Sequence, residues 1–434
     1  MSTASSSSSQ DGGDGGGDGG EFAGPSHARR RFNTAVWPEP FLEALATQIA
    51  IDAGRLAAAP ALANIFQVCR TWRSVSQSEP LWQTLTRRIW HRHHLQHPSW
   101  HEEYVYRHRT ASNFRSRTYN YTILNFPPNE NNNEALSCCR LALSDHHLAA
   151  GFSDGSVRLF HLPTRIYITT FHPHQRNHLG LYSRAVSGIF FTDNRLVFAS
   201  LDGDIHVASI NVQGAPRRAH LGDVVTDGVL VDFTGCNRWW VGLYAGVPNR
   251  AFHVRNSNTE EVVFIGGTLT DPDAVDGWHL LTDLTGQIGR IRITHDDMAV
   301  GFTSRRVIVF DLRNQMILGE EEFRREINVG VADAYDNALI FVNSRSVANV
   351  LQVGSLEEIC RFMARGSLLG CINGGYGFIS VGGGIRVWEL ERGERLYILR
   401  EQIGNVTAMV VDEQYAAASS VDNTIHLWDF GAHI

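Results

Sequence analysis

Lysine is absent from this 434-residue chain, and all 38 of its basic side chains are arginine. Lysine ordinarily shares the basic positions of a protein with arginine. A GC-rich coding bias that replaces lysine by arginine is one explanation. A functional explanation is also open, because ubiquitin is attached to lysine amines, whereas an arginine guanidinium stays protonated and poorly nucleophilic. The absence of lysine would protect a protein that works beside a ubiquitin-conjugating enzyme.

Long apolar runs and cysteine motifs are also missing. No uninterrupted run reaches the roughly 18 apolar residues that a membrane-spanning helix needs. The first 20 residues have neither the basic start nor the apolar core of a secretory signal. The six cysteines include no C-x-x-C pair, and a chain of this size does not need disulfides for stability. We therefore expect no membrane partner and a reducing compartment, the cytosol or the nucleus.

Signatures of catalysis are lacking as well. The sequence contains no G-x-S-x-G, no P-loop and no H-E-x-x-H motif. His91, His93 and His94 form a cluster, but no partner stands at the spacing that a metal site requires. The sequence predicts a protein that is not an enzyme and that has no metal or other cofactor.

The region from residue 36 to residue 90 is instead rich in large apolar residues at helical spacing. Pro38 suits the first turn of a helix, and Pro80 begins another. About fifty residues of short helices cannot bury so many large apolar groups among themselves. Surplus apolar surface on a small helical unit indicates a binding partner. The alternative is an ordinary helical unit that packs only on its own chain.

The order of residues in this region resembles an F-box, with the cluster C-R-x-W-R at 69–73 followed by Leu81 and Trp82. Two departures are Trp37, where the family usually has leucine, and the alanine-rich stretch 57–63. The resemblance implies docking onto a Skp-type adaptor and, through it, onto a cullin ubiquitin ligase. The residues expected to contact the adaptor are Pro38, Phe41, Leu42, Leu45, Ile49, Leu62, Val68, Cys69, Trp72, Leu81 and Trp82.

Charge is distributed unevenly along the chain. Residues 27–118 hold 13 arginines and 6 acids, whereas residues 119–434 hold 25 arginines and 35 acids. Residues 1–35 form a Ser/Gly/Asp-rich tail that we expect to be disordered. The basic helical region leaves direct DNA binding open as an alternative. That alternative is disfavoured because its tryptophans fall at apolar helical positions and no recognition helix is evident.

Residues 91–117 continue the helical pattern as a linker. Ser99 is a candidate N-cap, and Glu102 follows three residues later, as in a capping box. The stretch is similar to the linker of F-box proteins that carry WD40 propellers. Its matching positions are Trp100, Tyr104, Arg107, His108, Arg109, Asn113 and Arg115.

Beyond residue 118 the pattern changes to short alternating strands separated by Gly, Asp and Asn. One unit recurs seven times, and its third strand is anchored by Phe160, Ala208, Arg255, Phe310, Leu351, Trp388 and Trp428. The successive gaps of 48, 47, 55, 41, 37 and 40 residues bracket the period of WD40 repeats. We expect a seven-bladed β-propeller over 118–434, closed by the strand 118–126. The fold class is therefore multidomain, with a small all-α F-box and linker before an all-β propeller.

The turn between the second and third strands of each blade suggests a substrate-binding face. Asp154, Asp202 and Asp422 occupy this turn in three blades. Arginine takes the place in three neighbouring blades, at Arg250, Arg305, Arg306 and Arg345. Guanidinium groups suit carboxylate or phosphate. These arginines are our candidates for binding an acidic or phosphorylated segment of a substrate; the alternative is simple divergence of the turns.

Both regions together resemble the plant sterile apetala proteins, a family of regulators of flower and organ development. The resemblance rests on eight phrases, which are W-P-E-P-F-L, A-A-A-P-A-L-A-N, R-A-V-S-G-I, D-G-D-I-H-V-A, V-D-F-T-G-C, R-W-W-V-G-L, G-G-T-L-T-D-P and I-H-L-W-D-F-G. It implies a nuclear substrate receptor of a cullin ligase, with a nuclear regulatory protein as its substrate. The alternatives are a transcriptional regulator bound to DNA or chromatin and a scaffold without a ligase role.

Overall fold

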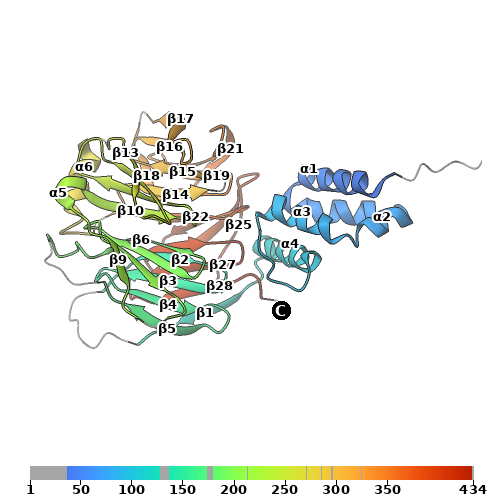
Figure 1. Ribbon diagram of the computed structural model, residues 1–434, viewed down its shortest axis with the longest axis horizontal. Helices are drawn as coiled ribbons and strands as arrows, with labels where there is room; N and C mark the ends of the chain where they lie inside the picture. Colours follow the sequence, from blue (N-terminus) through green and yellow to red (C-terminus); the bar gives the residue numbers. More distant parts are fainter. Residues whose placement is uncertain are drawn as a thin grey trace, which may run out of the picture.

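The computed structural model describes residues 37–127, 136–173, 179–212, 214–269, 271–284, 286–294, 297–323 and 325–432. The expected disordered tail 1–35 lies outside the described residues. Four helices come first in the chain and stand together at one side of a β-propeller (Figure 1). The predicted fold class is thus confirmed, with a helical N-terminal region followed by seven four-stranded sheets.

The four N-terminal helices are α1 (Glu39–Phe66), α2 (Arg70–Val75), α3 (Glu79–Trp90) and α4 (Trp100–Ser116). Pro38 precedes α1, and Pro80 lies in the first turn of α3, where no intrahelical donor is needed. The Ser99 hydroxyl accepts a 3.2 Å hydrogen bond from the Glu102 N–H at the start of α4. The N-cap expected at Ser99 is therefore confirmed.

Helix α1 is interrupted at Gly54, whose backbone angles (φ 77°, ψ 170°) lie outside the helical region. Judged by length and composition alone, α1 would suffice to cross a membrane. A count of uninterrupted apolar residues does not find it, because Thr47, Gln48 and Asp52 break the run. In the structure α1 packs against α3 and α4 through the buried residues Ala46, Ala50, Ala58 and Leu62.

Large apolar residues continue at helical spacing from Leu62 to Trp72, but the structure has a break there instead of one continuous helix. Helix α1 ends at Phe66 and α2 begins at Arg70. Cys69 is extended (φ −157°, ψ 172°) and stands at the N-cap position of α2. Val68 and Cys69 consequently lie in a connection rather than on a helix face.

Each blade of the propeller is an antiparallel sheet whose first strand lies at the centre of the ring. The first strands are β2 (Cys138–Leu143), β6 (Val186–Thr192), β10 (Val229–Gly235), β14 (Arg290–Thr294), β18 (Ile327–Tyr335), β22 (Ser367–Ile372) and β26 (Val406–Val411). The second strands are β3 (His147–Phe152), β7 (Arg195–Ser200), β11 (Trp239–Ala245), β15 (Met298–Phe302), β19 (Ala338–Asn343), β23 (Tyr376–Val381) and β27 (Tyr415–Ser420). The third strands are β4 (Val157–His161), β8 (Ile205–Ser209), β12 (Phe252–Asn256), β16 (Arg306–Asp311), β20 (Val347–Gln352), β24 (Gly384–Glu389) and β28 (Ile425–Asp429). The fourth, outer strands are β5 (Ile166–Phe171), β9 (Arg217–His220), β13 (Val262–Gly266), β17 (Met316–Glu322), β21 (Glu358–Met363), β25 (Glu394–Ile398) and β1 (Asn120–Leu124).

All seven anchor residues inferred from the repeat lie on third strands. Trp428 shows why a large aromatic side chain suits this position. It is completely buried, and its indole N–H donates a 2.8 Å hydrogen bond to the Glu401 carboxylate. A large side chain here fills the space between neighbouring sheets while its polar edge is satisfied.

The last blade takes its outer strand from the beginning of the propeller. Strand β1 pairs antiparallel with β28, in a register from Asn120 opposite Asp429 to Leu124 opposite Ile425. Leu124 is buried between the first and last blades. This pairing covers the edge that β28 would otherwise expose.

The two faces of the ring differ in what covers them. The helices contact the loops between first and second strands, and we call this side the lower face. Arg92 pairs with Asp145 (2.7 Å), and Arg55 pairs with Glu413 (3.1 Å). The basic helical region thus docks on an acidic rim. The short helices α5 (Val224–Asp227) and α6 (Asp271–His279) lie on the opposite, upper face (Figure 1).

Candidate protein-interaction surfaces

The beginning of α1 presents a row of large apolar side chains to solvent. Trp37, Phe41 and Leu45 have exposed fractions of 57%, 45% and 39%. Phe41 and Leu45 are four residues apart on one face of α1, and Trp37 precedes the helix. The rings of Trp37 and Phe41 stack with centroids 4.7 Å apart. We call these three residues the apolar row; it is a pre-ordered hydrophobic surface of the kind that marks protein interfaces.

The other residues expected to contact an adaptor divide by their exposure. Pro38, Val68 and Cys69 are exposed, Ile49 and Trp72 are half-buried, and Leu42, Leu62, Leu81 and Trp82 are buried. The main-chain N–H of Trp72 holds the pKa of the exposed Cys69 thiol below its usual value. The exposed members, together with the apolar row, are the part of the set that a partner can reach directly.

Trp82 is a core residue of the helical region. Its indole N–H donates a 2.8 Å hydrogen bond to the Ser76 carbonyl, and its ring lies against Tyr104 at 5.1 Å. Leu81 retains 1% of its surface and Trp82 retains 6%. In this chain they join α3 with α1 and α4, and their contact with an adaptor stays a prediction. Helical spacing shows which residues share an apolar face. It does not show whether that face packs against the same chain or against a partner.

On the upper face, the aspartate side chain in each of the three turns forms hydrogen bonds within its own turn. Asp154 accepts a 2.9 Å hydrogen bond from the Ser156 N–H. Asp422 likewise accepts one of 3.0 Å from the Thr424 N–H. Aspartate at this position is thus explained by the local turn geometry.

In the blades with arginine, another residue holds the turn. Thr303 accepts from the Arg306 N–H at 3.0 Å, and Asn343 accepts from the Arg345 N–H at 2.9 Å. The side chains of Arg305 and Arg345 are left exposed. Within the described ranges, neither guanidinium has an ion-pair or hydrogen-bond partner. Both groups are available to an external acidic group.

The two other candidate arginines are engaged within the protein. Arg250 pairs with Asp227 at 2.5 Å, and Arg306 pairs with Glu320 at 3.0 Å. The four candidates therefore do not form one continuous free arc. Arg305 and Arg345 are the pair that the structure leaves accessible.

Sequence reasoning missed the apolar character of the upper face. Exposed apolar residues lie there in connecting loops, in the helices α5 and α6 and at the start of β22, at Leu179, Leu181, Leu221, Val225, Val275, Trp278, Leu368 and Val421. A hollow of about 450 Å³ on this face has Leu280, Leu284 and Leu368 in its lining. Alternation within a strand does not reveal these residues, because seven of the eight lie outside the strands. The described residues hold no group of three or more His, Cys, Asp or Glu side chains arranged to hold a metal.

Comparison with known proteins identifies one relative over the whole length. The chain is 53% identical over 447 residues to the Arabidopsis thaliana protein named "Transcriptional regulator STERILE APETALA", and the match covers 100% of both chains. The family model "WD domain, G-beta repeat" matches residues 393–429, which include β25 to β28.

Solved structures align with part of the chain. BamB from Moraxella catarrhalis aligns at 13% identity and a TM-score of 0.46, over 67% of this chain and 85% of BamB. The computationally designed Ika8 protein aligns at 15% identity and the same TM-score, over 68% of this chain and 97% of the design.

Proposed function

Because this chain belongs to the STERILE APETALA family, we propose that it is the substrate-recognition subunit of a cullin ubiquitin ligase that acts on nuclear regulators of flower and organ development. The relative carries the name of a transcriptional regulator, and a WD40 propeller suits a protein-interaction scaffold. A receptor of this kind needs no catalytic residue. It raises the effective concentration of a substrate lysine near the conjugating enzyme.

The apolar row carries the first half of the proposal. Trp37, Phe41 and Leu45 stand at the beginning of α1, away from the contact between the helices and the propeller (Figure 1). Burial of such side chains in an adaptor would be the main source of binding free energy, because large buried anchors dominate interfaces. Leu81 and Trp82 belong to the buried core of the same helical region, together with Leu42.

The upper face carries the second half of the proposal. It lies opposite the helices, so a substrate bound there would not compete with the adaptor for space. Exposed apolar side chains on the same face as Arg305 and Arg345 suit a segment that combines large apolar residues with carboxylates or phosphates. The substrate is in this proposal a nuclear regulatory protein.

Affinity purification of the full chain tests the adaptor half. The wild-type chain should retain a Skp-type adaptor and a cullin, and the double variant Phe41→Asp/Leu45→Asp should lose both. A matched control is Ile166→Asp, which changes a 61%-exposed apolar residue on the outer strand β5 of the propeller. The control should retain both partners, and all variants should unfold at the wild-type temperature.

Two outcomes would contradict the proposal. The first is retention of the adaptor by the double variant. The second is retention of the wild-type chain on DNA with a steep dependence on salt and without an adaptor, as a direct DNA-binding regulator would show. Trp82→Ala separates folding from contact, since it should lower the stability of the helical region.

A further inference from the structure

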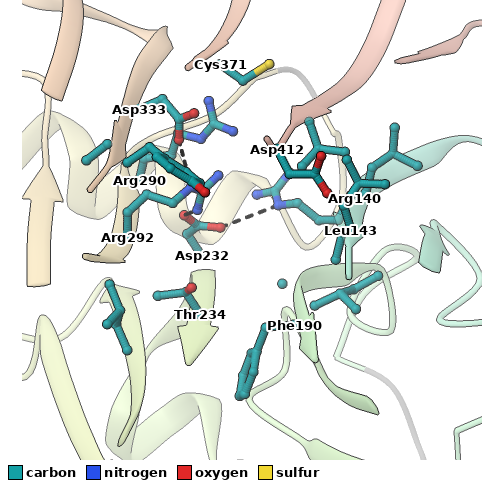
Figure 2. A pocket seen from close by; sticks show the side chains of 18 of the residues that line it. Arg140, Leu143, Phe190, Asp232, Thr234, Arg290, Arg292, Asp333, Cys371 and Asp412 are labelled. Atoms are coloured by element: carbon teal, nitrogen blue, oxygen red, sulfur yellow. Dashed lines mark hydrogen bonds and ion pairs between the residues drawn. The ribbon is translucent and has the colours of Figure 1, made fainter. Parts of the chain in front are cut away.

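The centre of the propeller contains a buried cluster of charged residues that the proposed function does not use (Figure 2). It is built from first strands and consists of Arg140, Asp232, Arg290, Arg292 and Asp333. Arg292 joins the two carboxylates, at 3.1 Å from Asp232 and 2.8 Å from Asp333. Arg140 pairs with the other oxygen of Asp232 at 3.5 Å.

Each carboxylate oxygen already has a partner. Asp232 also accepts the main-chain N–H of Ile291 at 2.8 Å. Asp333 accepts the main-chain N–H of Ile372 at 3.0 Å through the oxygen that Arg292 does not contact. Among the described residues, neither carboxylate forms an ion pair with the third arginine, Arg290.

Arg290 is therefore a buried cation without a carboxylate partner in the described part of the chain. It is 7% exposed, and one terminal nitrogen donates to the carbonyls of Ala332 and Gly370, both at 2.9 Å. Its Nε has no hydrogen-bond partner among the described residues. Burial, together with the neighbouring Arg292, lowers the pKa of Arg290 to about 10. An unpaired guanidinium in such a place is unfavourable unless an anion joins it.

A cavity of about 350 Å³ adjoins the cluster. Its walls are apolar at Leu143, Phe190 and Ile293, and Thr234 adds a hydroxyl group. This volume is at the lower end of the range for small-molecule sites. Figure 2 shows the arginines and carboxylates gathered at one side of the cavity, with Thr234 and Phe190 at the other.

Asp412 limits the charge of any occupant. It is the remaining acidic residue in the lining, and it accepts main-chain hydrogen bonds from Gln414 and Tyr415 at 2.7 and 2.6 Å. Three guanidinium groups face two paired carboxylates and this third one. Positive and negative groups in the lining are thus equal in number, and Arg290 is the one of these three arginines without a carboxylate partner among the described residues, so a singly charged ligand with an apolar body fits better than a doubly charged phosphate.

We propose that the lower half of the central channel binds a small carboxylic acid with an aromatic or aliphatic body. The carboxylate pairs with Arg290, and the body packs against Leu143, Phe190 and Ile293. The lower mouth lies beside the junction with the helices, where Arg92 pairs with Asp145. Binding of a ligand in the channel would therefore affect the contact between the helical region and the propeller.

Titration calorimetry of the full chain with benzoate tests this site. Benzoate should bind at one site per chain, and benzamide, which has the same shape without the charge, should not bind. Arg290→Met should weaken binding about tenfold or more, since loss of a charge-assisted hydrogen bond has an effect of that size. Removal of a buried unpaired charge is compatible with folding, and the thermal unfolding of the variant verifies it. The matched control is Arg365→Gln, at an exposed turn of the propeller, which should bind benzoate as the wild type does.

Thr234→Val provides a second variant that changes no charge, and it should weaken benzoate binding several-fold. The proposal is overturned if the wild type shows no saturable heat with benzoate, or if benzoate binds equally to Arg290→Met. It is also overturned if inorganic phosphate binds and benzoate does not, because the site would then select a compact multivalent anion.

Discussion

The ring of Phe114, in the last turn of α4, is stacked on the ring of Phe430 with centroids 3.9 Å apart and planes 14° apart. Asn113, beside it, donates a 2.8 Å hydrogen bond to the carbonyl of Phe430. The Tyr376 hydroxyl donates another of 2.8 Å to the carbonyl of Ala111. Helix α4 is thereby fixed to the last two blades. The distance between the apolar row and the upper face is then set by packed side chains rather than by a flexible linker.

Phe114→Ala should destabilise the protein by about 3–5 kcal/mol, because it leaves a cavity at a fully buried aromatic contact. It should also expose residues 91–119 to protease, since the helices lose their main anchor on the ring. Urea unfolding and limited proteolysis measure these effects. Phe41→Ala is the control and should change stability by less than about 0.5 kcal/mol, as expected at an exposed position. Unfolding of Phe114→Ala at the wild-type urea concentration would show that the stacking contributes nothing.

Strand β1 makes a separate prediction about the propeller. Deletion of residues 118–126 should lower the melting temperature and broaden the transition, because β28 loses its partner and the first and last blades lose Leu124. Differential scanning calorimetry measures the change. Deletion of residues 3–20, which lie outside the described residues, serves as the control and should leave the melting temperature and the width of the transition unchanged. A sharp transition at the wild-type temperature after deletion of 118–126 would mean that the ring is held by other contacts.

The repeat period identified the third strand of every blade, including the blade anchored by Ala208 rather than by an aromatic residue. This was possible because strand alternation and repeat length are local properties of the sequence. The helical region was harder to interpret. Leu81 and Trp82 match the family pattern as closely as the exposed Leu45 does, yet they face inward. Both interior and partner surfaces require large apolar residues, so the residue type does not distinguish them.

The buried cluster of charged residues at the centre of the propeller could not be predicted from the sequence, for a different reason. The segment R-I-R-I of β14 alternates charge with apolar residues and was visible as a strand. Its partners Asp232 and Asp333 stand in other blades, about 40 to 60 residues away. Only the packing of three neighbouring blades brings both carboxylates within 3.1 Å of Arg292. Alternation places Arg290 and Arg292 on one face of β14, but the pairing depends on how the three blades are placed relative to one another.

Arg305 and Arg345 should control substrate capture. Reversal of both charges, Arg305→Glu with Arg345→Glu, should abolish recovery of substrate proteins in cross-linking proteomics, because neither group is needed for its turn. The melting temperature and adaptor binding should be unchanged. The control is Arg250→Glu with Asp227→Arg, which preserves an internal ion pair on the same face and should retain substrates. Full recovery of substrates by the Arg305/Arg345 variant would exclude these turns from the binding surface.

His253 makes stability depend on pH. It is buried in β12, its ring stacks on Tyr244 at 4.0 Å, and neither ring nitrogen has a hydrogen-bond partner in the described ranges. Burial lowers its pKa from 6.5 to about 4. Below pH 6.5 the unfolded chain binds a proton that the folded chain does not, so stability is lost as pH falls from 6.5 toward 4. His253→Phe keeps the stacking and should remove part of this loss, of the order of 2 kcal/mol.

Chemical unfolding at pH 7.5 and at pH 5 measures the contribution of His253. The difference in the free energy of unfolding between His253→Phe and the wild type should be larger at pH 5 than at pH 7.5. Part of the loss should persist, because burial also lowers the pKa of His220 to about 4. The solvent-exposed His279 provides the control, and His279→Gln should leave the pH dependence unchanged. If the difference in the free energy of unfolding between His253→Phe and the wild type is the same at the two pH values, titration of His253 does not contribute to the pH dependence of stability.

The absence of lysine leads to a prediction about the lifetime of the protein. Arg217→Lys, Arg218→Lys and Arg365→Lys keep the charge, and Arg217 and Arg365 are exposed on the propeller. If the chain is a ligase receptor, the triple variant should acquire ubiquitin at the new amines and turn over faster than the wild type. The same lysines placed in the Phe41→Asp/Leu45→Asp background should not shorten the lifetime, because that variant cannot dock onto the adaptor. Pulse-chase measurement in cells that supply a Skp-type adaptor distinguishes the two explanations. An unchanged lifetime of the adaptor-bound triple variant would favour coding bias as the reason that lysine is missing.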